Sequence, residues 1–239
     1  IRSKIVDVFN PFSLINVLSD SDLKNYWASS GATSMLPKFV DNMELKLRNF
    51  DPCTILRQTI ETSDVTGGGA ELFLYQSGYL TIKGYQMGVY ILGFPNSEVR
   101  QALYETVLPA LTLRGNSDIQ SIQSDLLLSI QLGNLPEAMK CLKALIADVP
   151  YSNKKLASMD MEERYRLIMS TIFNAIGCRV EVEKMIATGR IDMVVETTQY
   201  IYVLELKLSD NGGVDAAAEQ IRAKQYAEPF KADKRKVIA

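Results

Sequence analysis

Apolar positions recur at two different spacings in the C-terminal part of the chain, and each spacing predicts a different kind of element. Residues 159–176 have the three- to four-residue spacing of an amphipathic helix, with apolar side chains at Tyr165, Ile168, Met169, Ile172 and Phe173. Gly177 is a favourable end for that helix. Residues 179–186, 189–196 and 200–207 are instead rich in β-branched and apolar side chains, so we expect three strands there.

A second helix and a short strand follow this pattern. A polar turn at residues 209–213 precedes a helical stretch at about 214–226, and a last strand is expected to start near Lys236. The order is then a helix, three strands, a helix and a strand. We therefore predict an α/β domain from Tyr151 to the end of the chain, residues 151–239.

The N-terminal pattern predicts helices and one β-hairpin. Helices are expected at residues 34–50 and 70–79, and residues 80–85 and 88–93 read as two short strands around a tight turn. Helices followed by a hairpin predict a winged-helix-like unit in residues 1–96.

Residues 97–150 predict a helical connector. Its three expected helices cover residues 97–113, 117–132 and 135–147, the first with a cap at Ser97 and Glu98. The chain as a whole is thus predicted to be α+β or α/β, with a helical, winged-helix-like N-terminal region before the α/β domain.

Three charged residues interrupt the apolar pattern of the predicted strands. Asp192 lies on the second strand, and Glu205 and Lys207 lie at the end of the third, on the same side because strand side chains alternate. Charges there are costly to bury without partners, and a hairpin would bring Asp192 beside the other two. Two carboxylates can hold a divalent metal, and the lysine can orient a water or stabilise a phosphorane. The alternative reading is a plain edge-strand ion pair.

These residues and the element order resemble the PD-(D/E)XK nuclease superfamily. The resemblance extends to the nuclease domain that ends a bacterial group of AAA-ATPase-like proteins, through Gly189–Asp192, Tyr202–Leu208 and Glu219–Ile221, with Lys224, Tyr226, Ala227 and Pro229. The N-terminal part is similar to segments downstream of that group's nucleotide-binding core, at Val8–Leu14, Asn25–Trp27 and Tyr75–Ile82. The resemblance covers nearly the whole chain.

The resemblance implies a restriction-endonuclease-like domain that hydrolyses phosphodiester bonds, of DNA more than of RNA, with Mg²⁺ or Mn²⁺. Asp192 and Glu205 would hold the metal together with the backbone carbonyl of Leu206. Lys207 would position the attacking water and offset charge on the phosphate. The alternative is a catalytically silent nuclease fold that binds nucleic acid or protein.

Two further site residues follow from the resemblance. The superfamily often places another carboxylate on the helix before the first strand, which here is Glu163, although a simple acidic helix N-terminus explains it equally well. Some relatives use a glutamine at the position of Gln220 to brace the site or contact DNA. The tyrosine that often follows it by four residues is replaced here by Lys224, with Tyr226 two positions further on.

The chain has no Gly-x-x-x-x-Gly-Lys-Ser/Thr motif, so it lacks the phosphate-binding loop of an ATPase core. We therefore expect residues 1–96 to be the C-terminal part of an AAA-ATPase-like region. We also expect the chain to be a fragment, without the ATPase core that would be its partner in the same protein, and truncated in the last strand of the nuclease-like domain.

Composition narrows the classes of protein. The absence of histidine excludes Ser-His-Asp hydrolysis and the usual Cys/His zinc sites. Three scattered cysteines indicate free thiols in a reducing compartment, and no apolar run approaches the roughly 20 residues of a membrane span, so we expect a cytoplasmic protein. The resemblance implies that it is bacterial. The net charge is −2, but a basic run near the C-terminus could contact a phosphate backbone or be a solvated surface: Arg222, Lys224, Lys231, Lys234, Arg235 and Lys236.

Overall fold

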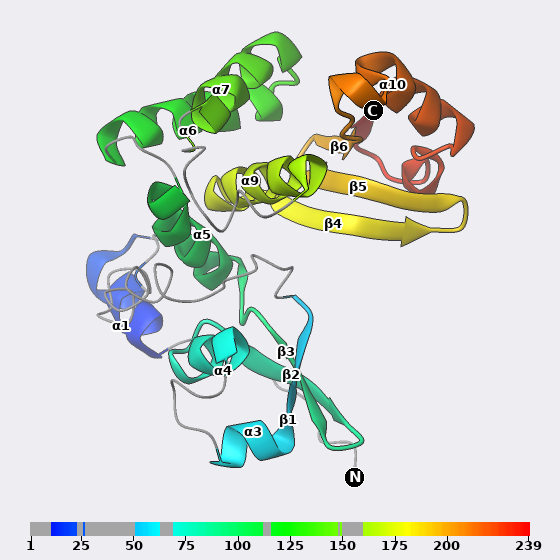
Figure 1. Cartoon of the computed structure of the whole chain (residues 1–239). Coiled ribbons are helices and arrows are strands. Elements are labelled where there is room, and N and C mark those ends of the chain that lie inside the picture. The colour runs from blue at the N-terminus through cyan, green and yellow to red at the C-terminus, as the bar shows by residue number, and fades with distance from the viewer. Residues whose placement is uncertain are drawn as a thin grey trace.

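The computed structural model of the chain describes residues 11–22, 26, 51–62, 69–111, 116–147, 149 and 160–239. The helix expected at residues 34–50 lies outside the described residues. The described chain forms two lobes, a smaller N-terminal one and a larger C-terminal one, with α5 running between them (Figure 1).

The N-terminal lobe contains a three-stranded sheet and short helices. Its elements are α1 (Pro11–Asp20), β1 (Cys53–Leu56), α3 (Arg57–Thr62), α4 (Gly69–Gln76), β2 (Thr81–Gln86) and β3 (Val89–Gly93). The predicted hairpin is confirmed as β2 and β3, whose turn holds Met87 and Gly88 at positive φ, as a tight hairpin requires. The strand β1 was not predicted, and it pairs with β3 to give the order β1-β3-β2.

The three connector helices are confirmed as α5 (Ser97–Leu111), α6 (Asn116–Gln131) and α7 (Leu135–Ala147). The predicted cap of α5 was wrong by one residue. The backbone N–H of Val99 donates to Asn96 Oδ1 at 2.9 Å, because an asparagine side chain just before the helix satisfies one of its free N–H groups.

The C-terminal domain has the predicted order of elements. Its elements are α9 (Met161–Ala175), β4 (Arg179–Ile186), β5 (Gly189–Glu196), β6 (Tyr200–Leu204), α10 (Gly213–Ala223) and β7 (Lys236–Ile238). The sheet order is β4-β5-β6-β7, with the first three strands antiparallel and β7 parallel to β6. Two C-terminal boundaries were wrong, since β6 ends at Leu204 and not at Lys207, and α10 ends at Ala223 and not near Tyr226.

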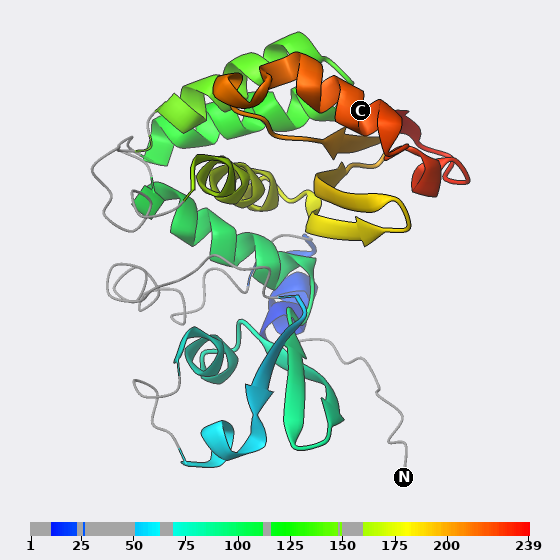
Figure 2. The same ribbon diagram turned by 45° about the vertical axis from the view of Figure 1, so that its right-hand side comes forward.

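The C-terminal sheet is buried on both faces. Met193, Val195 and Tyr202 belong to the core that includes α9, whereas a separate cluster on the side of α10 contains Ile191, Val194, Ile201, Val203, Tyr226 and Phe230. Figure 2 shows α9 and α10 on either side of the strands. This layering explains why the strands have near-continuous apolar sequences instead of a clean alternation.

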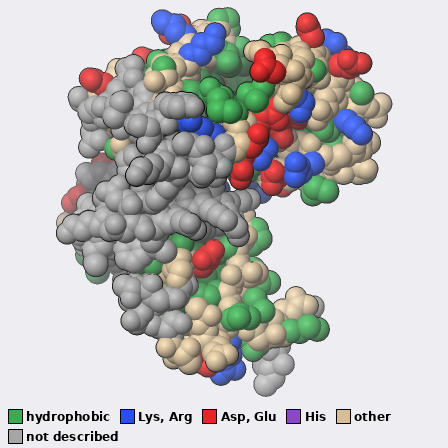
Figure 3. All heavy atoms as spheres, in the orientation of Figure 1, with side chains coloured by type: hydrophobic (Ala, Val, Ile, Leu, Met, Phe, Trp, Pro, Cys, Tyr) green, Lys and Arg blue, Asp and Glu red, His purple; other side chains and the backbone are tan. Residues whose placement is uncertain are grey.

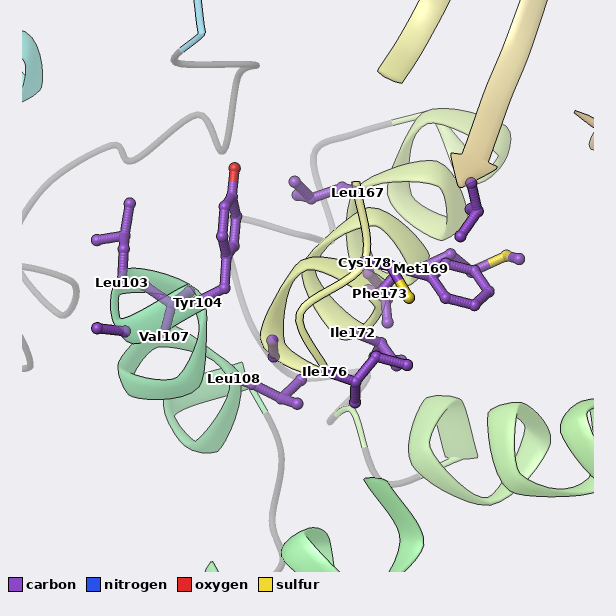
Figure 4. Close-up of a cluster of buried hydrophobic side chains, with 14 of the residues drawn as sticks. Leu103, Tyr104, Val107, Leu108, Leu167, Met169, Ile172, Phe173, Ile176 and Cys178 are labelled. Carbon is purple, nitrogen blue, oxygen red and sulfur yellow. The ribbon is translucent and has the colours of Figure 1, made fainter. Parts of the chain in front are cut away.

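The core on the α9 side continues into the connector. Leu108 of α5 points towards Ile172 and Ile176 at the end of α9, whereas Leu103 and Val107 lie on the opposite side of α5 (Figure 4). Residues of β1, α4 and β3 belong to the same buried cluster, so the hydrophobic core runs without interruption from the small sheet to the large one.

The end of α6 is hydrogen-bonded to the β5–β6 hairpin. Tyr202 Oη donates to the carbonyl of Ile130 at 2.6 Å, and Thr198 Oγ1 donates to Gln131 Oε1 at 2.7 Å. The Tyr202 hydroxyl satisfies one of the backbone carbonyls that a helix C-terminus leaves free, and the Thr198 hydroxyl binds a side chain of the same helix end. The connector is therefore fixed to the strand that leads to Glu205.

The cysteines agree with the prediction of free thiols. Cys53, Cys141 and Cys178 are all unpaired, and the last two are buried. In the part of the chain that the structure describes, none of the helices is both long enough and apolar enough to cross a membrane.

Candidate active site

The candidate site is centred on Asp192, in the middle of the large sheet. On one side, the pairs Val182–Met193 and Lys184–Ile191 place Glu183 of β4 across from Asp192. On the other side, the pair Met193–Leu204 places Glu205, one residue beyond β6, across from it. Three carboxylates thus come from three adjacent segments of chain.

Asp192 replaces a strand hydrogen bond with a side-chain one. Its Oδ2 accepts from the backbone N–H of Leu206 at 2.9 Å. That N–H points to a side chain instead of to a strand partner, which gives a physical reason why β6 ends at Leu204. Asp192 Oδ1 lies 3.4 Å from Nη1 of Arg166, and Asp192 is 9% exposed.

Glu205 is the most deeply buried carboxylate of the site, with a side chain that is 1% exposed. Its Oε1 lies 3.1 Å from Nζ of Lys207 and accepts a hydrogen bond from Gln220 Nε2. Among the residues that the structure describes, none donates a hydrogen bond to the buried Oε2. Burial raises the pKa of Glu205, and the nearby Asp192 adds to this, against the lowering effect of Lys207.

Lys207 is a partly buried cation held among carboxylates. Its side chain is 22% exposed. Desolvation lowers its pKa, but the attraction of Glu205, with smaller contributions from Glu162 and Asp192, raises the pKa overall. Lys207 is therefore fully protonated near neutral pH.

Gln220 connects α10 to the site. It donates to Glu205 and, at 3.0 Å, to Tyr226 Oη, and Tyr226 in turn donates to the carbonyl of Arg190 at 2.7 Å. Tyr226, six residues after Gln220, is thus the tyrosine that contacts the glutamine. Lys224, at the spacing common in relatives, is exposed.

The carboxylate of α9 that reaches towards the site is Glu162. Its Oε1 accepts from the backbone N–H of Leu208 at 3.3 Å and from Asn211 Nδ2 at 3.2 Å. Glu163, the residue expected here from the resemblance, is exposed. The side chain of Asp160 caps α9 through the N–H of Glu162, which fits the reading of an acidic helix start.

Sequence reasoning missed two residues beside Asp192. Arg166 of α9 is 16% exposed and lies between Asp192 and Glu183, with Nη2 3.2 Å from Glu183 Oε1. Glu162 and Arg166 stand four apart on α9, but this spacing does not separate Arg166 from the other charges of the helix, because its role depends on how α9 packs across the sheet. Nothing in the strand pattern distinguished Glu183 from the other charges of β4.

The donor atoms fit a hard divalent cation in part. Such ions take carboxylate and carbonyl oxygens, and Glu205 Oε2 is a buried oxygen to which no described residue donates a hydrogen bond. The described residues contain no group of three or more His, Cys, Asp and Glu side chains arranged to hold a metal. A metal here would therefore rely on Asp192, Glu205 and a backbone carbonyl such as that of Leu206, with water or substrate as further ligands.

The basic run near the C-terminus is divided between ion pairs and exposed charges. Arg235 pairs with Glu196 and Asp233, both at 2.8 Å, and Lys231 pairs with Glu228 at 2.5 Å. The remaining cations of the run are exposed, namely Arg222, Lys224, Lys234 and Lys236. Figure 3 shows acidic and basic side chains intermixed on the C-terminal lobe, without a large basic surface on the face in view.

Comparison with known proteins identifies the C-terminal domain. Residues 160–239 match the PD-(D/E)XK nuclease superfamily. The chain is also 29% identical over 245 residues to a protein from Azotobacter chroococcum mcd 1 described as "Uncharacterized protein in vnfD 5'region", a match that covers 94% of this chain and 44% of the relative. The chain thus spans less than half of that relative's length, and no solved structure matches it. Residues 160–239 form a domain of the PD-(D/E)XK nuclease superfamily, as the sequence predicted.

Proposed function

We propose that the C-terminal domain is a metal-dependent nuclease that hydrolyses phosphodiester bonds, of DNA more than of RNA. The observation that carries the proposal is the convergence of Asp192, Glu205 and Lys207 in one partly buried site of a superfamily domain. The buried Glu205 Oε2, which accepts no hydrogen bond from the described residues, adds support, since a buried carboxylate oxygen without a partner costs stability unless something else binds it.

Asp192, Glu205 and the carbonyl of Leu206 are the groups that would hold Mg²⁺ or Mn²⁺. A bound divalent ion would supply electrostatic stabilisation of the phosphate and a lower pKa for a bound water. The protein's own part is to orient the two carboxylates. The N–H of Leu206 fixes Asp192, and the Gln220–Tyr226 pair fixes Glu205 from the side of α10.

Lys207 is the group that would face the substrate's developing charge. Its ammonium carries a full charge near neutral pH and its side chain is 22% exposed, so it can reach a ligand at the surface of the site. A fixed cation there would orient the attacking water and stabilise the extra negative charge on phosphate.

The test is cleavage of single- and double-stranded DNA and RNA by the purified chain with Mg²⁺ or Mn²⁺, and with EDTA as the blank. We expect Asp192→Asn and Lys207→Met to lower the rate by on the order of 100-fold or more while circular dichroism and melting temperature stay near those of the wild type. Glu181→Gln, a charge change on β4 away from the site, should leave cleavage intact. Equal cleavage by the wild type and Asp192→Asn would contradict the proposal, as would a metal-loaded, folded wild type that cleaves none of the four substrates.

The wider setting of the domain is also a proposal. We infer that residues 1–96 are a winged-helix-like part of an AAA-ATPase-like region, that residues 97–150 connect it to the nuclease, and that an ATPase core elsewhere in a longer cytoplasmic protein is a partner. The β1-β3-β2 sheet with its hairpin supports the first inference. Joint expression of the chain with the preceding region of its parent protein, followed by co-purification, tests the last one.

A further inference from the structure

Two arginines from different elements converge on one carboxylate oxygen next to the candidate site. Nη2 of Arg166 on α9 and Nη1 of Arg190 on β5 each lie 3.2 Å from Oε1 of Glu183. Guanidinium groups bind carboxylate and phosphate oxygens with the same geometry and comparable strength. The oxygen of Glu183 therefore marks a position where two guanidinium groups can bind an anionic oxygen together.

The backbone of Glu183 is unusual for a strand. Its φ is +54°, in the left-handed region that non-glycine residues rarely adopt, although residues on both sides of it pair regularly with β5. A strained residue persists only where its surroundings hold it, and here the pairs Val182–Met193 and Lys184–Ile191 fix the backbone on both sides of Glu183, while its side chain lies against Arg166 and Arg190.

The three side chains differ in how easily they can move. The side chain of Arg166 is only 16% exposed and is also held by Asp192, so it is a fixed part of the site. Glu183 is 43% exposed and Arg190 is 54% exposed. Glu183 can thus swing into water without burying its charge, which would leave both guanidinium groups facing the solvent beside Asp192.

We propose that Arg166 and Arg190 form a binding site for a backbone phosphate of the nucleic acid, and that the carboxylate of Glu183 occupies it when no substrate is bound. The inference rests on the proposed nuclease function for the identity of the ligand. Arg166 links this phosphate site directly to Asp192, so the phosphate would lie next to the position of cleavage. Glu183 then weakens binding, because the substrate must displace it.

The test is the affinity for a short fluorescent DNA oligonucleotide, single-stranded and duplex, measured by fluorescence anisotropy in EDTA so that cleavage does not interfere. Glu183→Gln keeps the shape but removes the competing charge, and we expect it to bind several-fold more tightly than the wild type. Its affinity should also depend more steeply on salt, by about 0.7 to 0.9 in the log–log slope for one further phosphate contact. The matched control is Glu181→Gln, which makes the same charge change two residues away on β4, where Glu181 pairs with Lys184.

The double variant Glu183→Gln/Arg190→Gln separates a specific site from a general charge effect. It should lose the gain and bind no better than the wild type. Equal affinities of Glu183→Gln and Glu181→Gln, or a gain that survives removal of Arg190, would overturn the proposal, and so would no binding by any variant. Because no metal is present, a tighter Glu183→Gln combined with no cleavage under any condition would refute the nuclease function and leave the phosphate site standing.

Discussion

At the scale of single residues, Asp192 organises the site because it is bonded in two directions. Its carboxylate accepts a hydrogen bond from the N–H of Leu206, and this bond ends the pairing of β6. The same carboxylate lies beside Arg166 of α9. The sequence predicted that Asp192, Glu205 and Lys207 would come together, since strand pairing and alternation suffice for that. It could not predict Arg166 or Glu183, because their roles depend on how α9 packs across the sheet.

Tyr226 is predicted to matter through its hydroxyl group. Tyr226 is 1% exposed, and its Oη bonds both Gln220 and the carbonyl of Arg190. Tyr226→Phe removes the hydroxyl and leaves both partners without a hydrogen bond to it. We therefore expect the free energy of unfolding to fall by about 1–3 kcal/mol in urea titrations. Tyr85→Phe is the control, since Tyr85 is 52% exposed and should change stability by less than about 0.5 kcal/mol. Equal effects of the two substitutions would contradict the assigned role.

Cys178 is predicted to resist alkylation in the folded protein. Burial raises the pKa of its thiol to about 12, and only the thiolate reacts. Below that pKa the thiolate fraction falls tenfold for each unit of pH, so at pH 8 iodoacetamide should modify native Cys178 roughly a thousandfold more slowly than the same residue in urea. Peptide mass spectrometry resolves the position, and similar rates in both states would show that Cys178 is accessible.

At the scale of elements, the sequence predicted the strands β4 and β5 and the helix α7 at their observed bounds. Their apolar runs are bounded by glycine or polar turns, which is where sequence signals are strongest. The strand β1 was missed because four residues with only Ile55 buried carry little periodicity. Its pairing with β3 is a long-range interaction that local pattern does not encode.

The contact between α6 and the β5–β6 hairpin is predicted to depend on Gly133. This residue has φ +72°, and a Cβ there would lie 2.7 Å from the ring of Tyr200. Gly133→Ala should lower the free energy of unfolding by about 1–2 kcal/mol because of the backbone conformation, and by a further amount because of the clash with Tyr200. Gly88→Ala is the matched control, because Gly88 has φ +83° but nothing within 4 Å of a new Cβ. The difference in melting temperature between the two variants measures the clash, and no difference would mean that Tyr200 moves freely.

At the scale of the whole molecule, the chain shares one hydrophobic core across the boundaries predicted from sequence. Leu108 of α5 and Leu145 of α7 belong to the same buried cluster as Ile172 of α9 and Tyr202 of β6. Sequence patterns located the connector but could not show that it covers a face of α9. The superfamily match begins at residue 160, after these helices.

We therefore predict that the superfamily domain needs the connector to fold well. A fragment of residues 97–239 should melt cooperatively, whereas residues 160–239 alone should expose the apolar face of α9, bind the dye ANS and lack a cooperative transition. Circular dichroism melts and dye fluorescence of the two fragments provide the comparison. A cooperative melt of residues 160–239 at the temperature of the longer fragment would show that the shared core is dispensable.

The most direct test of the central claim is calorimetric titration of Mn²⁺ into the purified chain, Asp192→Asn and Glu205→Gln, with Glu181→Gln as the control. We predict binding by the wild type and the control and none by the two site variants, all four remaining folded. In the variants that bind the metal, a free Mn²⁺ concentration of 100 times the Kd should raise the free energy of unfolding by about 2.7 kcal/mol. Mn²⁺ binding that persists unchanged in both site variants, or no binding by the folded wild type, would contradict a metal site at Asp192 and Glu205.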